Sequence, residues 1–429
     1  MALPRQGQEV KRFVDHMKIR ICSMRSSSRV AALFAGLLLL AGCERIHELT
    51  RPKAKVEAPA PALAVQPLAV QAAEAPSFTE KTGKFSIEPR FKFAKAFENG
   101  LAPVELDDGK WGFIDVSGKL VIPAIFDGAR QFSEEGLANV RIGGVLTGMH
   151  GFIDRAGKFV INPQYARVFD FHDKRAAVWI GPSLQDGKWG FLDTAGKLII
   201  PAQFDAVKSF SEGMAAVRVG DDKTGKWGFI DLNGKYVLNP RYDAVRSVRE
   251  GLIVFFDNET EKNGIADKKG TVLVAPQFDG LGEFSDGLAG FAVGARETAK
   301  LGYIDKMGKV VVNPTYDAAK SFSEGFAAVR VGDQKTGKWG YIDTTGKLVV
   351  HTQFSSGEYA QSPGDFSQGL AMVLIGDEKS GSVGFIDSQG KMVINPQFSG
   401  SYTAGGFSEG LAAVRVGNEA TGKFGYIHR

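Results

Sequence analysis

The chain has 429 residues, of which 44% are hydrophobic, so it is long enough for several domains and can bury a sizeable core. Its formal net charge is +4, but residues 1–42 alone hold seven basic and two acidic residues. The rest of the chain is near neutral, with 45 basic and 46 acidic residues, and this balance excludes the basic stripe that drives nucleic-acid binding.

The N-terminal segment has the order of a signal peptide. A basic stretch ends at Arg29, and Val30 to Ala41 is an uncharged, mostly apolar run that is too short for an ordinary membrane span. The run ends in Leu40-Ala41-Gly42-Cys43, which resembles the lipobox of bacterial lipoproteins. The resemblance implies that residues 1–42 are a signal peptide, that Cys43 is acylated and becomes the mature N-terminus, and that acyl chains anchor the protein to a membrane. Three translation start sites remain possible: Met1, Met17 and Met24.

The lipobox resemblance also implies a location. Glu44, rather than Asp, follows the cysteine, and in lipoproteins of Gram-negative bacteria this favours delivery to the outer membrane, on its periplasmic side. The other cysteine, Cys22, lies within the signal peptide, so we expect no disulfide in the mature protein. Residues 43–76 are rich in Ala and Pro and are interpreted as an extended tether between the anchor and a folded body.

A repeated motif occupies residues 77–429. It reads Lys110-Trp111-Gly112-Phe113-Ile114-Asp115, then Gly118-Lys119, and its first glycine, Gly112, recurs at intervals of 36 to 44 residues up to Gly425. Such a period is typical of small supersecondary units that bury their faces against their neighbours. Counting the Gly-Lys turns gives about nine units, and Lys423 to Ile427 is a surplus copy of the Trp-Gly strand.

Each unit is expected to contain four short antiparallel strands. Runs of four to eight residues rich in Val, Ile, Phe and Tyr, bounded by Gly and Pro, indicate strands. In Asp231-Leu232-Asn233-Gly234, the Asp begins a tight turn and the Gly can adopt the left-handed backbone conformation that closes it. The flanking strands should therefore form a hairpin. The Pro of Asn239-Pro240 should end pairing or lie on an edge strand, because it donates no ladder hydrogen bond.

These units resemble the WG repeats, also called KWG repeats, of bacterial proteins, and the resemblance covers about four-fifths of the chain. The family implies a β-repeat architecture and a general interaction role, but no reaction. The Trp position is filled by other residues in the weaker copies, so we interpret Trp227 and its equivalents as buried packing groups.

The fold class is therefore all-β, and two architectures fit it. The first is a β-propeller with the alanine-rich strands, marked by Ala215, Ala327 and Ala412, at its crowded axis. In that case the surplus strand at the C-terminus replaces the worn first copy at Phe78 and closes the ring. The second is an open β superhelix, in which the surplus strand caps the stack.

The repeated polar residues do not form a recognisable catalytic or metal-binding constellation. Each motif Asp sits at the same turn of its own unit, one unit away from the next, so turn capping explains it better than paired acid–base chemistry. The Gly-Lys pairs open strands rather than helices, which excludes phosphate loops. The histidines lack metal-ligand spacing, and no Gly-x-Ser-x-Gly elbow occurs. We expect no catalytic residue, no cofactor and no metal, and we interpret the protein as non-catalytic.

The sequence predicts a lipid-anchored binding or scaffold protein of the cell envelope, with an envelope protein or glycan as partner and no nucleic acid. An accessory or degenerate envelope enzyme acting on glycans and a structural spacer are the alternatives. Because sister units share their core residues, recognition is expected where the units differ. The longest insertion is Ser355 to Gly364, and its candidate partner-binding residues are Glu358, Tyr359 and Asp365.

Replacing the lipobox cysteine tests the proposed anchor. Cys43→Ser removes the sulfur that would be acylated, so the protein should be released from membranes or stay unprocessed. Membrane fractionation and gel mobility measure this, and normal processing with full membrane retention would contradict the anchor. Fractionation of the unaltered protein with the inner membrane would contradict the role assigned to Glu44.

Overall fold

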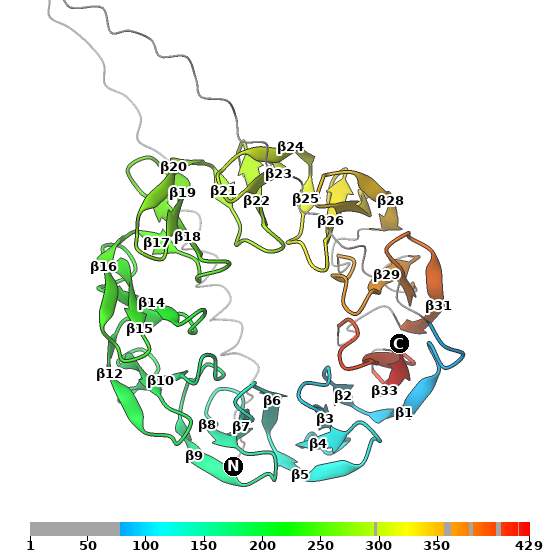
Figure 1. Ribbon diagram of the computed structural model, residues 1–429. Coiled ribbons are helices and arrows are strands. Elements are labelled where there is room, and N and C mark those ends of the chain that lie inside the picture. The colour runs from blue at the N-terminus through cyan, green and yellow to red at the C-terminus, as the bar shows by residue number, and fades with distance from the viewer. Residues whose placement is uncertain (1–77, 296–297, 356–361, 377–380, 400–404, 419) are drawn as a thin grey trace, which may run out of the picture. The chain divides into compact units, whose positions relative to one another are not determined.

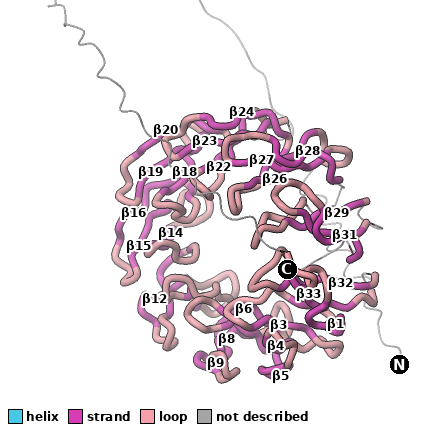
Figure 2. Tube along the Cα trace, turned by 45° about the vertical axis from the view of Figure 1, so that its right-hand side comes forward, coloured by secondary structure: helices cyan, strands magenta, loops and turns pink. Residues whose placement is uncertain are grey.

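The computed structural model describes residues 78–295, 298–355, 362–376, 381–399, 405–418 and 420–429, all of which lie in the unit formed by residues 71–429. The described residues form nine antiparallel sheets of three or four strands. The sheets follow one another around a ring, each with its first strand toward the centre and its last strand outside (Figure 1). The tube view shows the same ring with loops projecting toward its centre (Figure 2).

Each sheet is one blade of this ring, and its strands are numbered from the centre outward. The innermost strands are β2 (Phe93–Ala94), β6 (Gly128–Phe132), β13 (Ala206–Val207), β17 (Ala244–Val245), β21 (Gly280–Leu281) and β25 (Ala318–Ala319). The second strands are β3 (Leu101–Glu105), β7 (Ala138–Ile142), β10 (Ala176–Ile180), β14 (Met214–Val219), β18 (Leu252–Asp257), β22 (Leu288–Val293), β26 (Phe326–Val331), β29 (Ala371–Ile375) and β32 (Leu411–Val416).

The two outer layers carry the signature motif and the strand that follows it. The third strands are β4 (Trp111–Asp115), β8 (Met149–Ile153), β11 (Lys188–Leu192), β15 (Lys226–Asp231), β19 (Lys262–Asp267), β23 (Lys300–Asp305), β27 (Lys338–Asp343), β30 (Ser382–Ile386) and β33 (Lys423–His428). The outermost strands are β5 (Leu120–Phe126), β9 (Phe159–Tyr165), β12 (Leu198–Phe204), β16 (Tyr236–Tyr242), β20 (Val272–Phe278), β24 (Val310–Tyr316), β28 (Leu348–Ser355), β31 (Met392–Ser399) and β1 (Phe85–Phe91).

The two ends of the described chain share one blade. Strand β1 is the outermost strand of the sheet β1-β33-β32, with Phe85 opposite Ile427 and Phe91 opposite Phe424. Gly83 N donates to the His428 carbonyl at 2.8 Å, where the other blades have a covalent hairpin turn. The closed ring predicted from the surplus strand is confirmed, and the open superhelix is wrong.

The order of strands corrects one detail of the expectation. The alanine-rich strands that contain Ala215 and Ala327 are second from the centre, because a two-residue strand precedes each of them. The strand with Ala412, β32, is the innermost strand of its described three-stranded sheet. The aromatic segment 203–210 belongs to two blades: Phe204 ends β12, and β13 begins the next sheet. The unit read from the sequence therefore begins and ends at different strands from the blade. Residue spacing alone does not reveal this difference.

The glycine of the Trp-Gly pair is required by the close approach of the outermost strand. Trp227 pairs with Tyr242 and Phe229 with Leu238, so β16 bulges opposite Gly228. A Cβ on Gly228 would lie 2.5 Å from the Leu238 carbonyl oxygen. The bulge contains Pro240, which donates no hydrogen bond and lies on the edge strand, as expected.

The glycine of the Gly-Lys turn locks neighbouring blades together. Gly234 adopts φ 84°, and a Cβ there would lie 3.0 Å from the Ile200 side chain of the preceding blade. The same contact joins Gly118 to Ile87 and Gly83 to Ile394, on either side of the closing blade. Because the aliphatic side chain packs directly on the turn backbone, a larger residue in the turn would push two blades apart.

The hydrophobic core is divided among the interfaces between blades. One cluster, for example, joins Trp189, Phe191 and Ile200 of one blade to Phe210 and Val217 of the next. The regularly spaced phenylalanines of the repeats are core residues. Among the signature tryptophans, Trp189 and Trp339 are buried, whereas Trp227 is only partly buried. Lys208 and Arg218 each lie 5.8 Å from the Trp227 ring centroid, so cations cover the face that the core leaves open.

Two glycine substitutions separate close packing from backbone conformation. Gly228→Ala places a methyl group against backbone atoms that cannot rotate away, so it should destabilise the fold by more than ~3 kcal/mol. Gly213→Ala meets no atom within 4 Å but keeps φ at 79°, so it should cost only about 1–2 kcal/mol. Denaturant unfolding of both variants measures the difference, and equal losses would contradict the role of the bulge.

Candidate functional site

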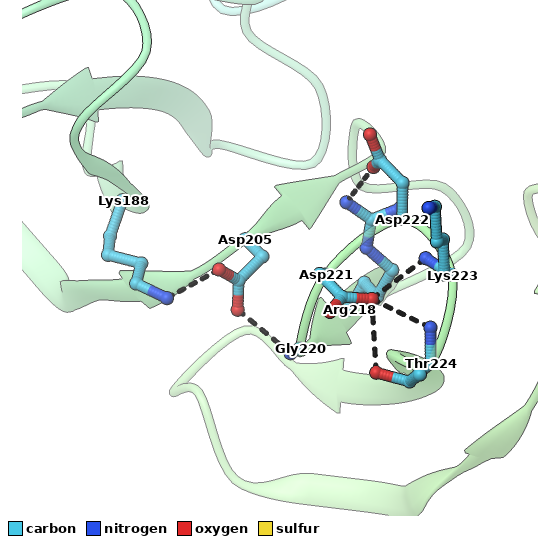
Figure 3. A network of polar contacts seen from close by, with 8 residues as sticks. All are labelled: Lys188, Asp205, Arg218, Gly220, Asp221, Asp222, Lys223 and Thr224. Atoms are coloured by element: carbon cyan, nitrogen blue, oxygen red, sulfur yellow. Dashed lines mark hydrogen bonds and ion pairs between the residues drawn. The ribbon is translucent and has the colours of Figure 1, made fainter.

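The lysine of the Lys-Trp-Gly motif belongs to a structural clamp. Lys188 pairs with Asp205, and the second oxygen of Asp205 accepts from Gly220 N at 2.9 Å in the next blade (Figure 3). The clamp recurs with Lys226 and Asp243 and with Lys300 and Asp317. The Lys–Asp pair thus joins one blade to the hairpin between the second and third strands of the next blade, which we call the outer hairpin. In these blades the aspartate neutralises the charge of the motif lysine.

The motif aspartates cap turns, as predicted. Asp231 Oδ1 accepts from Asn233 N at 2.9 Å and from Lys235 N at 3.0 Å. The loop aspartate Asp221 does the same for Lys223 and Thr224 in the outer hairpin (Figure 3). Their carboxylates therefore act within their own turns.

A third repeated feature is a tight turn between the first and second strands, which we call the inner turn. In most blades it reads Phe-Ser-Glu-Gly or a close variant, and its acidic residue has a positive φ, 53° at Glu212. Inner turns project toward the centre of the ring (Figure 1). The Glu212 carboxylate accepts from Gly251 N of the next inner turn at 2.9 Å.

These contacts run head to tail around the ring of described residues. The carboxylate or amide oxygen of one inner turn accepts from a backbone N–H of the next at Glu135, Asp173, Glu212, Glu250, Asp286, Glu324, Gln368 and Glu409. The remaining link is reversed: the Asn99 side-chain amide donates to the Phe132 and Ser133 carbonyls. Inner-turn carboxylates are thus held in fixed positions by the scaffold.

Serines form a second set of links between inner turns. In five blades the serine hydroxyl donates to a carbonyl of the next inner turn, as from Ser211 to Val248 at 2.8 Å. Three blades replace this serine, with Glu98, His172 and Arg249. In a fourth, the inner turn has an extra residue, Glu135, after Ser133 and Glu134. The departures from the repeated serine of the inner turn therefore all lie in the first five blades along the chain.

A hollow of about 540 Å³ lies where these departures meet, and we call it the inner-turn hollow. It is lined by inner turns of five consecutive blades. Its charged lining residues are Glu98, Glu134, Glu135, Asp170, His172, Asp173, Glu212 and Arg249. Six carboxylates and one guanidinium line it, and three of these lining residues, Glu98, His172 and Arg249, replace the repeated serine.

Burial opposes ionisation of two carboxylates of the inner-turn hollow. Burial raises the pKa of Asp170, although Arg130, His172 and Lys95 act in the opposite direction. Burial, with the charges of Asp170 and Glu409, also raises the pKa of Glu98. Asp170 has one partner, Arg130, at 3.4 Å. For these two side chains the effect of burial on the pKa outweighs that of the neighbouring basic groups.

Several oxygen atoms of the hollow have no hydrogen-bond partner among the described residues. They are Ser133 Oγ, Glu135 Oε2 and Asp170 Oδ1, all three buried. Buried acceptors without partners are uncommon and costly, so their presence in one hollow is informative. Sequence reasoning missed this site because it weighed insertions rather than substitutions; the replacement of serine by Glu98 and His172 was the available signal.

The sequence-predicted site residues are distributed differently. Cys43, Glu358 and Tyr359 lie outside the described residues. Asp365 is described and pairs with Lys320 at 2.8 Å, beside a separate hollow of about 520 Å³. No group of three or more His, Cys, Asp or Glu within the described ranges is arranged to hold a metal ion. The described part of the chain contains no helix long and apolar enough to cross a membrane.

Taken together, the closed ring, its nine sheets and the shared final blade define an all-β, nine-bladed β-propeller. A family model described as WG containing repeat matches nine segments, residues 80–111, 111–145, 151–179, 189–223, 227–259, 264–295, 302–334, 339–378 and 384–419. The chain belongs to this WG-repeat family. No curated relative matches the chain.

Solved structures similar to this chain include a eukaryotic initiation factor, with 13% identity and a TM-score of 0.53 over 73% of this chain and 89% of that one. Another is the dihydro-heme d1 dehydrogenase NirN in complex with DHE, with 16% identity and a TM-score of 0.44 over 72% and 76%. A third is the β-propeller domain of the Trilobed protease from Pyrococcus furiosus, with 12% identity and a TM-score of 0.35 over 61% and 95%. At these identities the likeness concerns the fold alone.

Two aspartates should respond to pH in opposite directions. The raised pKa of Asp170 means that its ionisation destabilises the fold as pH rises above the ordinary carboxyl range, so Asp170→Asn should raise Tm at pH 7 and change it little at pH 3.5. Burial opposes ionisation of Asp205, but Lys188 and Gly220 N–H lower its pKa. Asp205→Asn should therefore lower stability by about 1 kcal/mol at pH 7, and the loss should shrink on acidification.

Thermal unfolding of both variants at the two pH values measures these shifts. If both variants lost the same stability at pH 7, the distinction between a strained carboxylate and a clamped one would be wrong.

Proposed function

We propose that this protein is a non-catalytic binding or scaffold protein of the cell envelope, anchored through an acylated Cys43 and engaging an envelope protein or glycan. The lipobox resemblance and Glu44 support the anchor and the outer-membrane location. Membership of the WG-repeat family supports a β scaffold in which the repeated residues serve the fold.

One observation carries the proposal. The polar residues that the repeats share are engaged inside the scaffold: the motif lysines in clamps, the motif aspartates in turns and the inner-turn carboxylates in the ring of hydrogen bonds. The polar residues that distinguish one blade from another instead meet in the inner-turn hollow. A rigid ring with one blade-specific hollow has the organisation of a binding module.

The binding role can be tested by restoring the repeat pattern in the hollow. The double variant Glu98→Ser and His172→Ser introduces the serine found at this position in sister blades, so it should fold normally. We expect it to lose partners that the unaltered chain captures from envelope extracts. Capture followed by mass spectrometry, with the melting temperature as a control for folding, measures this.

A parallel variant examines the alternative site at the long insertion. Asp365→Ser introduces the residue found before the inner-turn phenylalanine at Ser209 and Ser321. If this variant alone lost the captured partners, recognition would belong to the loop of Glu358, Tyr359 and Asp365. Unchanged capture by both folded variants would favour a structural spacer.

A further inference from the structure

One interface between blades lacks the Lys–Asp clamp, and both members of the clamp are replaced there. Met149, on the second blade (β6–β9), stands where sister blades have the clamp lysine, and Ala166 stands where they have the clamp aspartate. Five other blades keep the charged pair, as at Lys188 and Asp205 (Figure 3). Because both charges are missing together, neither clamp position is charged at the interface with the third blade (β10–β12).

A hollow of about 570 Å³ lies at this interface, and we call it the outer hollow. Met149 and Ala166 line it, and Tyr165, Trp179 and Leu184 add large apolar groups to its wall. No residue in its lining carries a charge, unlike the lining of the inner-turn hollow. The outer hollow therefore suits an apolar side chain better than a charged ligand.

The outer hairpin beside this hollow is apolar as well. Val145 and Leu146 stand where the equivalent hairpin of the fourth blade (β13–β16) has Asp222 and Lys223. Their exposed fractions are 83% and 84%, the highest of the large hydrophobic residues in the described part of the chain. Leu146 also lies in the wall of the outer hollow. Two adjacent apolar residues so exposed, next to an uncharged hollow, indicate an interaction surface.

We propose that this surface is an interface between two copies of the chain, in which Leu146 of each copy enters the outer hollow of the other. A two-fold interface uses the same surface patch on both copies, so the patch must be complementary to itself. Here a projecting apolar side chain and an uncharged hollow lie next to each other on the same pair of blades. The inference goes beyond the proposed binding function and depends neither on the anchor nor on an envelope partner.

The pattern of charge favours a second copy as the occupant. Near a two-fold axis each side chain faces its own counterpart, so a charged residue there would meet a like charge. At this surface, charged residues of both signs found in sister blades are replaced by uncharged ones, at Val145, Leu146, Met149 and Ala166. A different partner of opposite charge would explain the replacement of one sign only.

A membrane surface is a less suitable occupant. The outer hairpins that flank these two blades carry exposed carboxylates, at Asp107 and Asp108 on the first blade (β2–β5) and at Asp222 on the fourth. Anionic headgroups would repel these carboxylates. Lys223 lies beside Asp222 in the sequence, so the flanking hairpins of a second copy offer charges of both signs.

Site-specific photo-crosslinking tests the interface in the full chain within intact cells. With p-benzoylphenylalanine in place of Leu146, we expect a product of twice the monomer mass, in which mass spectrometry locates the link at the partner's outer hollow. Met307 provides the matched control position, because it is 72% exposed but lies in a turn of the sixth blade (β21–β24). The same probe in place of Met307 should give no dimeric product.

Two variants of the chain that carries the probe restore residues of the sister blades. Val145→Asp introduces the residue found at Asp222, and the double variant Met149→Lys and Ala166→Asp introduces a clamp pair. Each variant should lower the yield of the dimeric product at least about tenfold, because charge would then enter the two-fold contact. Each should keep the melting temperature of the parent chain, since sister blades fold with the same residues.

Several results would overturn the inference. They are the absence of a dimeric product, a link from position 146 to lipid or to a different protein in place of a second copy, and an equal yield of dimer from the probe at position 307. An unchanged yield of dimer in either folded variant would overturn it as well.

Discussion

The pairing of β1 with β33 is the contact on which the whole ring depends. Every other blade is a continuous stretch of chain, but the last one exists only when residues 85–91 lie against residues 423–428. Tyr426 strengthens this closure, because its hydroxyl donates to the Lys95 carbonyl of the first blade at 2.7 Å. Closure also removes the two free sheet faces that an open stack would expose to water.

The signature motif follows from this architecture. Nine blades in a closed ring must each fit two neighbours at a fixed angle, so the same atoms recur at every interface. The Trp-Gly glycine admits the bulge of the outermost strand, the turn glycine receives an aliphatic side chain from the preceding blade, and the lysine joins two blades through an aspartate. The residues of the motif therefore determine how neighbouring blades pack, which explains why the motif shows no catalytic pattern.

Much of this architecture could be predicted from the sequence because local turn chemistry determined it. Asp231 and Gly234 indicated the hairpin, and Pro240 indicated an edge strand or the end of pairing. The surplus copy at Lys423 to Ile427 fitted a closed ring and an open stack equally, and its pairing with β1 decides for the ring. The two-residue strands were missed because two residues carry no periodicity. Trp227 was expected to be buried, yet whether a tryptophan is covered by core or by cations depends on the next blade.

The inner-turn hollow could not be predicted for a related reason. Glu98 lies far in sequence from Asp170 and His172, and each one alone looks like a tolerated change at a polar surface. Only the ring brings them together, because inner turns of consecutive blades lie side by side at its centre. The informative comparison is among equivalent positions of different blades, and it needs the blade boundaries that the structure supplies.

The shared final blade has a consequence for how the protein reaches this state. Phe85 and Ile427 are separated by almost the whole folded part of the chain, so their pairing is among the least local contacts in the molecule. Loop-closure entropy for such a separation exceeds that of an ordinary hairpin by about 3 kcal/mol. During synthesis, eight blades can assemble before the first strand has its partner. The last step of folding is then a single slow ring closure, which the arrival of the final strand permits.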